Sequence, residues 1–387
     1  APSGELDPYY ILTFAGLSFC IIFAVMTAID ICMKNTSIEE CKFFTTKSFV
    51  YRCFLIGFCN ALNGLFLVFA APPSRTPTFL QAILGTFNIA WTILFRAMII
   101  RKFPTIMQYV WAAGVFVGLF LASCPSIFGL EEGTSFKSEA PGAWKIMWPI
   151  IFASSFAPAA IMNVVGEDVL KETSESHIDR DQILTINQYS LEPEEKSVNV
   201  WYYLTIQSLA QFLTFVCCFW VCIIPNFGTV DTVSQIFDSL KQDWRYFFTL
   251  DGATWICPVR AGVFIFCYLL NYIGSSLMLR FTEGATWTAI VSALVTPLGG
   301  IFWFFFQITS SKADPPNKFE PYWDWNNSDI FIIVGLLVMA PFIFLYNRET
   351  QTLEDMEKEK QFYGANNRGY QKIDDEKEGE YAKRVAL

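Results

Sequence analysis

Side chains that enzymes use for chemistry are scarce in this sequence. The single histidine, His177, lies in a polar stretch, and no long apolar stretch carries a carboxylate near its centre. The carboxylates closest to such stretches, Asp30, Glu167 and Asp168, lie at their ends. Hydrolysis or acyl transfer needs a base beside a nucleophile, and metal catalysis needs clustered ligands. We therefore expect a protein that is not an enzyme and that binds no metal or cofactor.

Neutral polar side chains are the remaining candidates for a functional site, because many of them lie inside apolar stretches. Leaving them unpaired in lipid would be costly, so they must face one another or a wet cavity. The competing explanation is hydrogen bonding between helices, which contributes roughly 0.6 kcal/mol per bond on average. Asn60, Asn63 and Gln207 are embedded in the same way but are not placed in the predicted site. The predicted solute-binding residues, which would line a central cavity, are Gln81, Asn88, Asn163, Gln211, Asn271, Thr288, Ser292 and Thr296, with Asn163 near the cytosolic gate.

The composition indicates that these residues lie in membrane-spanning helices. Of the 387 residues, 53% are hydrophobic and only 16% are charged, whereas a soluble chain carries about 25% charged residues. So much apolar surface excludes a cytosolic protein. The net charge of -9, without a basic patch, argues against a nucleic-acid partner.

Nine stretches are apolar and long enough to cross a bilayer as helices. They run from Tyr9 to Cys32, Phe49 to Ala71, Pro77 to Ile99, Ile106 to Cys124, Ala143 to Val165, Val198 to Ile224, Pro258 to Leu279, Gly284 to Gln307 and Ser328 to Tyr346. We therefore predict an all-α, multi-pass protein embedded in a lipid bilayer. It would be built from two inverted repeats of about five transmembrane helices, nine of them visible in this chain.

Lysine and arginine residues set the predicted orientation, because cationic loops stay on the cytoplasmic side. Their bias places the C-terminus in the cytosol. The predicted organisation is a first transmembrane repeat (1–165), an acidic cytosolic linker (166–197), a second repeat (198–346) and a disordered cytosolic tail (347–387). Within the second repeat, apolar residues recur at three- and four-residue steps over 231–250, which predicts a lumenal helix on the bilayer surface. Since two inverted halves need an even number of spans, we expect one further helix upstream of Ala1.

Two prolines indicate where the site lies along the membrane normal. Pro158 falls in the middle of one predicted span, and Pro297, followed by Gly299 and Gly300, falls in the middle of another. Paired interruptions in corresponding halves point to the midplane binding site of a transporter.

Three segments resemble the drug/metabolite transporter superfamily and, within it, the chloroquine-resistance-transporter-like family. They are IIFASSFAPAAIMNVVGEDVLKE, LAQFLTFVCCFWVCIIP and the stretch from GVFIFCYLLNYIGSSLMLRF to TWTAIVSALVTPLGGIFWFFF. The resemblance covers about Phe49 to Tyr346. It implies a ten-helix fold of two inverted repeats around a central cavity, alternating access, and a surface helix in the long lumenal loop. Similar proteins lie in vacuolar, lysosomal or plastid membranes and move amino acids, small peptides or cationic drugs, often with a proton gradient.

The preferred interpretation is therefore a secondary-active transporter that moves small organic solutes across an organellar membrane by alternating access. The absence of a mid-membrane carboxylate weakens the case for a proton relay through carboxylates. A coupled proton would instead use Asp30, Glu167 or the solute itself. Two alternatives stay open. One is a sugar-phosphate or nucleotide-sugar antiporter of the same fold, with Arg52, Arg96 and Arg260 as candidate phosphate ligands. The other is a non-transporting membrane subunit of a larger complex.

The tail contains a Gly-Tyr-x-x-apolar string from Gly369 to Ile373. This string resembles the tyrosine-based sorting signals that clathrin adaptors read on the way to lysosomes. Tyr370 and Ile373 therefore predict a clathrin-adaptor partner and an endolysosomal destination.

Overall fold

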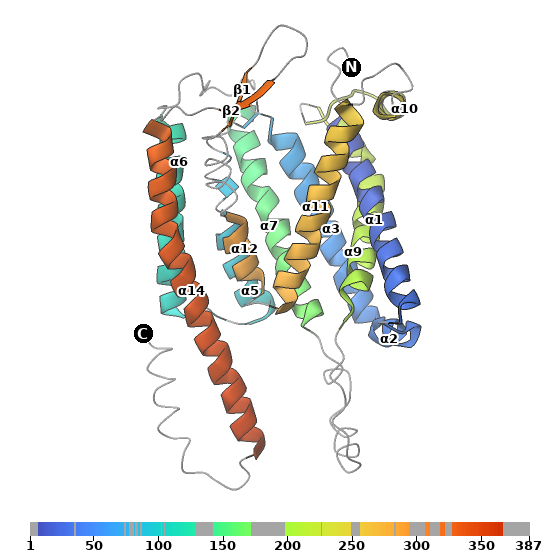
Figure 1. Ribbon diagram of the computed structural model, residues 1–387. Helices are drawn as coiled ribbons and strands as arrows, with labels where there is room; N and C mark the ends of the chain where they lie inside the picture. The colour runs from blue at the N-terminus through green and yellow to red at the C-terminus, as the bar shows by residue number, and fades with distance from the viewer. Residues whose placement is uncertain are drawn as a thin grey trace. The chain divides into compact units, whose positions relative to one another are not determined.

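Long apolar helices make up most of the chain (Figure 1). The computed structural model describes residues 7–34, 36–72, 75–76, 81, 84–85, 87–101, 103, 105–128, 142–171, 198–225, 227–248, 256–281, 284–293, 306–309, 318–321 and 327–366. Five helices in this part of the chain are long and apolar enough to cross a membrane, and three shorter apolar helices accompany them. Each of the nine predicted stretches contains a described helix. The chain is a polytopic, helical membrane protein, as predicted.

The elements are as follows. The apolar helices are α1 (Pro8–Cys32), α3 (Lys47–Ala70), α5 (Phe87–Ile99), α6 (Ile106–Phe128), α7 (Trp144–Leu170), α9 (Val200–Cys217), α11 (Ile256–Phe281), α12 (Ala285–Ala293) and α14 (Asn327–Asn366). The remaining elements are α2 (Ile38–Phe44), the 3-10 helix η2 (Phe219–Ile223), α10 (Val233–Phe247) and the antiparallel strands β1 (Phe306–Thr309) and β2 (Lys318–Pro321). In the strand pair, Phe306 lies opposite Pro321 and Thr309 opposite Lys318.

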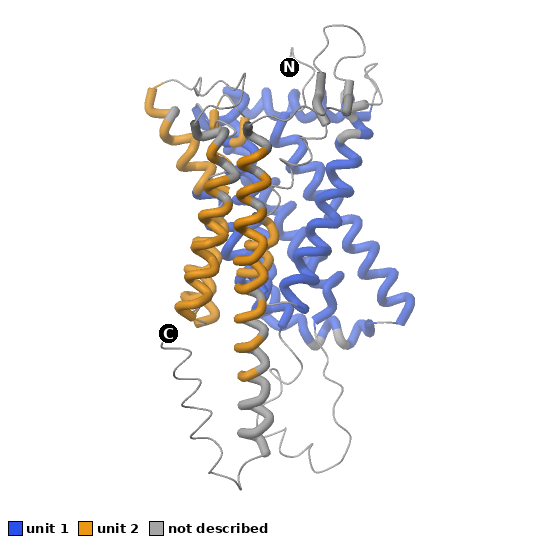
Figure 2. Tube along the Cα trace, turned by 60° about the vertical axis from the view of Figure 1, so that its left-hand side comes forward, with its two compact units in different colours: residues 1–70, 154–285 blue, residues 71–153, 286–387 orange. Residues whose placement is uncertain are grey.

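The chain forms two compact units, shown in different colours in Figure 2. Unit 1 consists of residues 1–70 and 154–285, and unit 2 of residues 71–153 and 286–387. Each unit therefore takes segments from both predicted repeats. The inverted-repeat relation and the repeat boundaries stay predictions.

In unit 1, α9 packs along both α1 and α3. The approach of α9 to α3 is close, because a side chain at Gly57 would collide with the backbone of Gln207 and Gln211 and with Ala210. Small residues at a helix interface let two backbones come together in this way, which is how helices associate in lipid.

Side-chain caps fix where α1 and α9 begin. Asp7 caps α1 by accepting a hydrogen bond of 2.8 Å from the backbone N–H of Tyr9. Asn199 caps α9 in the same way, and its Nδ2 also donates to Asp30 Oδ2 at 2.7 Å and to Thr36 Oγ1 at 2.6 Å. These bonds satisfy donors that a helix leaves free at its start, and they tie the end of α1 to the beginning of α9.

In unit 2, α6 and α14 form the most extensive helix pair. Gly114 and Gly118, spaced as a GxxxG motif, face this partner: a side chain at Gly114 would meet the ring of Phe342, and one at Gly118 would meet Met339 and the carbonyl of Gly335. A buried apolar cluster extends this interface to α5 and α12. It consists of Ile89, Val115, Ala289, Ile290, Met339, Ile343 and Tyr346.

The last helix is longer than expected. A helix of the 40 residues in α14 is about 60 Å long at 1.5 Å per residue, roughly twice the thickness of the hydrocarbon core. Residues 347–366 are therefore helical, although they belong to the tail that we expected to be disordered. The rest of that tail, with Tyr370 and Ile373, lies outside the described residues, as do His177 and most of the predicted linker.

Candidate functional site

Three helices of unit 1 bring a polar cluster together: Asn60 from α3, Gln211 from α9 and Tyr272 from α11. Asn60 Nδ2 donates to Gln211 Oε1 at 3.0 Å, and the Tyr272 hydroxyl donates to the same oxygen at 3.1 Å. Asn60 Nδ2 also donates to the Tyr272 hydroxyl. Gln211 thus accepts two hydrogen bonds at one carbonyl oxygen.

Aromatic rings from α1 enclose this cluster. The ring of Tyr272 lies 5.0 Å from that of Phe19 and 6.2 Å from that of Phe23, centroid to centroid. Asn60 is 7% exposed and Gln211 5%. In such a dry setting each hydrogen bond is electrostatically strong, and a missing partner would be costly. The cluster therefore holds α3, α9 and α11 in one register.

Gln207 lies one turn before Gln211 on α9 and is 4% exposed. Its carbonyl oxygen is buried and has no hydrogen-bond partner among the described residues. Buried acceptors are usually paired, with protein or with ordered water. Gln207 therefore differs from the saturated cluster beside it, because it retains an acceptor for a further donor.

A second amide of α3 supports the turn of α7 that contains Pro158. Proline lacks a backbone N–H and crowds the carbonyl four residues earlier, so it weakens the preceding turn. Asn63 Nδ2 donates at 2.8 Å to the carbonyl of Ser155 in that turn. The helix continues past Pro158 to Leu170, whereas Pro297 lies outside the described residues.

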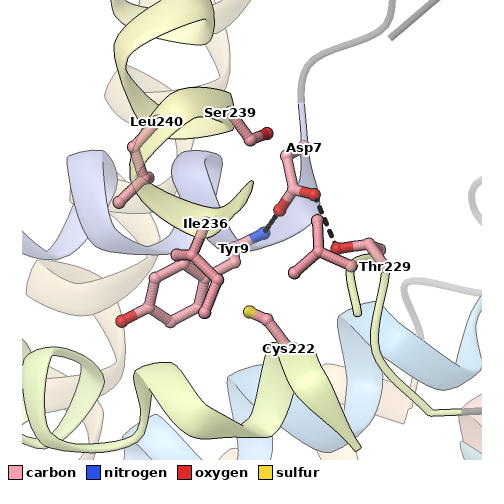
Figure 3. Close-up of a pocket in the computed structure, with 8 residues that line it drawn as sticks. Asp7, Tyr9, Cys222, Thr229, Ile236, Ser239 and Leu240 are labelled. Carbon is pink, nitrogen blue, oxygen red and sulfur yellow. Dashed lines mark hydrogen bonds between the residues drawn. The ribbon is translucent and has the colours of Figure 1, made fainter. Parts of the chain in front are cut away.

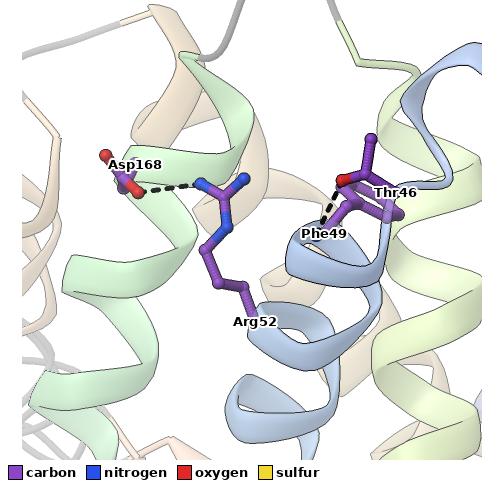
Figure 4. Close-up of polar contacts among 4 residues, drawn as sticks. All are labelled: Thr46, Phe49, Arg52 and Asp168. Carbon is purple, nitrogen blue, oxygen red and sulfur yellow. Dashed lines mark hydrogen bonds and ion pairs between the residues drawn. The ribbon is translucent and has the colours of Figure 1, made fainter. Parts of the chain in front are cut away.

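An ion pair joins α3 and α7 near one end of unit 1 (Figure 4). Arg52 Nη1 lies 2.9 Å from Asp168 Oδ2, and the two side chains are 19% and 51% exposed. Thr46 caps α3 close by, accepting a hydrogen bond of 3.1 Å from the Phe49 N–H. The charge of Arg52 is thus balanced inside unit 1, which weakens its interpretation as a phosphate ligand.

Glu167, adjacent to Asp168, joins the end of α7 to the start of α12. It is 3% exposed, and its Oε2 accepts a 2.9 Å hydrogen bond from the Ala285 N–H, the first of α12. Its Oε1 lies 3.3 Å from Lys171 Nζ. The preceding Gly284 has a φ of +83°, and a side chain there would collide with the Glu167 carboxylate. Only glycine adopts this backbone readily, so the carboxylate and the glycine together define the junction between α11 and α12.

The predicted solute-binding residues are distributed over both units. In unit 1, Asn163 and Gln211 are buried and Asn271 is exposed. In unit 2, Gln81 Nε2 donates to the carbonyls of Ala71 and Thr76 at 2.6 and 2.7 Å. These bonds tie Gln81 to the backbone that precedes it.

The other predicted residues of unit 2 show three different situations. The Asn88 side-chain oxygen is buried and has no partner in the part that the structure describes. Thr288 is 3% exposed, and its carbonyl accepts a 2.8 Å hydrogen bond from the hydroxyl of Ser292, which is itself exposed. Thr296 lies outside the described residues. Membership of these residues in one solute site stays a prediction.

Sequence reasoning missed Tyr272 as the partner of Gln211. It selected the neighbouring Asn271, because an amide inside an apolar stretch is conspicuous and a tyrosine is not. One helical step turns a side chain by about 100°, so Asn271 and Tyr272 cannot share a face. The usable signal was the pair Phe19 and Phe23, which provides an aromatic surface for a tyrosine ring.

No group of three or more histidine, cysteine or acidic side chains in the described ranges could hold a metal ion. The polar cluster of unit 1 consists of amides and a hydroxyl, with aromatic rings around it.

One comparison with known proteins identifies a family for this chain. The family model described as CRT-like, chloroquine-resistance transporter-like, matches residues 8–338. No curated protein matches the chain. A solved structure described only as the crystal structure of a protein is 11% identical, with a TM-score of 0.49 over 91% of this chain and 92% of that chain. The family match therefore carries the functional argument.

Proposed function

Because this chain belongs to the CRT-like, chloroquine-resistance transporter-like family, we propose that it is a secondary-active transporter working by alternating access in an organellar membrane. Family membership by itself indicates a membrane transporter with a small-molecule solute. The match over residues 8–338 is the observation that carries the proposal. The solute class and the mechanism go beyond this match, and each has separate support.

The solute that we propose is an amino acid, a small peptide or a cationic metabolite or drug. The polar groups of the Asn60–Gln211–Tyr272 cluster are neutral, and Gln207 beside it keeps an unpaired acceptor that suits an N–H donor. A phosphate-bearing solute would need free cations. Of the candidate phosphate ligands Arg52, Arg96 and Arg260, Arg52 is paired with Asp168, and the side chain of Arg260 lies outside the described part of the chain. The Arg52–Asp168 pair favours neutral and cationic solutes over sugar-phosphates.

Alternating access requires junctions that hold two helices in a defined but reversible relation. The Glu167 cap on α12 and the Arg52–Asp168 pair are such junctions within unit 1. Glu167 is also buried near the end of α7, and it is one of the groups predicted to carry a coupled proton. We propose that a proton gradient drives transport, with this end of unit 1 opening and closing.

Uptake into proteoliposomes tests the proposal. The purified chain is screened with labelled amino acids, dipeptides, glutathione, a cationic drug and sugar-phosphates, with and without a pH gradient. We expect uptake of at least one amine-bearing solute, stimulated by the gradient. Uptake of sugar-phosphates alone would support the antiporter instead, and no uptake of any class would support a non-transporting subunit.

Asn271→Ala assigns the solute path. Asn271 is an exposed amide in an apolar helix, so it is free to contact the solute, and its replacement should lower uptake severalfold. Its side chain makes no hydrogen bond among those described, so thermal stability should stay unchanged. Leu270→Ala, at a 53% exposed position one residue earlier, is the matched control and should leave uptake intact. Equal uptake by both variants would remove Asn271 from the site.

A further inference from the structure

A pair of carboxylates, Asp7 and Asp243, holds α10 against the beginning of α1 in unit 1. Asp243 of α10 is 6% exposed, and its Oδ2 accepts a hydrogen bond of 3.1 Å from the Asp7 N–H. The Asp7 carboxylate accepts from the Tyr9 N–H and from the Thr229 hydroxyl, each at 2.8 Å. We call Asp7, Thr229 and Asp243 the clasp.

Apolar contacts surround the clasp and complete the docking of α10. Ile236 and Phe247, on the docked face, are 3% and 7% exposed. The ring of Phe247 lies 4.7 Å from that of Phe14 and 6.2 Å from that of Tyr10. The opposite face remains apolar and open, with Phe237 63% exposed, as expected of a helix that rests on a bilayer surface. The clasp is therefore the polar centre of an otherwise apolar contact.

A small cavity lies beside the clasp, lined by Asp7, Tyr9, Cys222, Thr229, Ile236 and Leu240 (Figure 3). Its volume of about 10 Å³ is close to that of a single water position. Asp7 is partly exposed, whereas Asp243 is buried, so a negative charge on Asp243 is poorly screened by solvent.

The Asp7 carboxylate, at the start of α1, adds a second negative charge near Asp243. The Thr229 hydroxyl, which follows η2, and the Cys222 thiol of η2 line the same cavity as Asp7. The ionisable residues of α10 itself, Asp238, Lys241 and Arg245, are exposed to solvent. Burial raises the pKa of Asp243. The hydrogen bond from the Asp7 N–H lowers this pKa, the negative charge of Asp7 raises it, and the positive charge of the amino terminus lowers it, with a net upward shift.

We propose that the clasp is a proton-operated switch that keeps α10 docked on α1 when the compartment on its side is acidic and loosens it at neutral pH. A carboxyl whose pKa is higher when docked than when free binds a proton more readily in the docked state. Docking is therefore favoured at low pH and loses this stabilisation as the pH rises through the docked pKa. The side that carries α10 is the one predicted to be lumenal, so the switch distinguishes an acidic organelle from a neutral one. This inference stands whether or not the chain transports a solute.

Hydrogen exchange of the full chain in lipid nanodiscs tests the switch. Protection of the α10 amides is measured from pH 4.5 to 7.5, corrected for the intrinsic pH dependence of exchange and referred to the α9 amides. We expect protection of α10 to fall by roughly threefold to tenfold over this range, the scale on which one buried carboxylate acts. In Asp243→Asn protection should be independent of pH, and Asp238→Asn, an exposed carboxylate on the same helix, should behave as wild type.

A flat profile in the wild type, or the same fall in Asp243→Asn as in the wild type, overturns the proposal. If Asp243→Asn does not fold, Asp7→Asn decides, because asparagine keeps the helix cap and removes the opposing charge. A smaller fall in that variant supports the switch, and an unchanged fall overturns it.

Discussion

At the scale of single residues, the two hydrogen bonds accepted by Gln211 set the cost of changing it. Its carbonyl oxygen accepts from both Asn60 and Tyr272, so removing the amide deprives two donors of their common acceptor. Gln207, one turn away, has no such partners at its oxygen. The two glutamines therefore have different roles although both lie on α9 and are almost fully buried.

Gln211→Ala should lower the stability of the protein by roughly 0.6–2 kcal/mol, between the average for hydrogen bonds in lipid and the penalty for an unsatisfied buried group. Thermal melting in detergent, followed by size-exclusion chromatography, measures the change. Gln207→Ala is the matched control, since its oxygen loses no protein partner, and should shift melting less. A larger shift for Gln207→Ala than for Gln211→Ala would contradict the account of the cluster.

At the residue scale, polarity alone identifies the embedded amides but not which of them are buried. Gln211 and Asn163 stand out in apolar stretches and are buried, whereas Asn271 stands out in the same way and is exposed. The partners of these amides could not be predicted, because they depend on the rotation of neighbouring helices. Tyr272 rather than Asn271 contacts Gln211 for this reason. The same geometry gives the carbonyl oxygen of Gln211 two hydrogen bonds and that of Gln207 none among the described residues.

At the scale of elements, the contact between α6 and α14 depends on the absence of side chains at Gly114 and Gly118. Gly118→Leu should separate the helices and lower the stability by about 2 kcal/mol or more, because overpacking a tight interface displaces backbone. Melting of the purified variant gives the size of the effect. Gly262→Leu is the control, since nothing lies within 4 Å of the position that its Cβ would take, and a loss of similar size there would argue against the packing explanation.

The helices themselves were the most predictable elements, because hydropathy and length determine a membrane span. The extension of α14 was missed, since a segment with both signs of charge is commonly solvated and irregular. Its glutamate and lysine residues are nevertheless good helix formers, and Glu354 and Lys358 are spaced as a favourable i, i+4 pair. Helix propensity, rather than hydropathy, was the signal for residues 347–366.

At the scale of the whole molecule, the compact units are not the two predicted repeats. Sequence order suggests a first and a second half, but unit 1 joins residues 1–70 to 154–285 and unit 2 joins 71–153 to 286–387. Such interleaving depends on contacts between distant segments, and a single sequence without a second for comparison does not reveal them. The apolar pattern predicted the helices but not which helices pack together.

Unit 2 should retain its fold when the end of α14 is removed. The buried cluster of this unit ends at Tyr346, so truncation after Gln351 should change stability by less than about 0.5 kcal/mol, as for changes away from buried contacts. Truncation after Ala340 removes Ile343 and Tyr346 and should yield aggregated protein in size-exclusion chromatography. Equal behaviour of the two truncated chains would show that the cluster does not hold the unit together.

The pairing of α6 with α14 also constrains the order in which the protein can be made. Unit 1 is complete once Ala285 has been synthesised, but unit 2 needs residues from 286 to 387. At roughly 5–20 residues per second, these remaining 102 residues (387 minus 285) take about 5–20 s to translate. During that interval the glycine face of α6 has no helix to cover it. The glycine face of a newly inserted α6 must therefore be covered by lipid or by the insertion machinery until α14 has been synthesised.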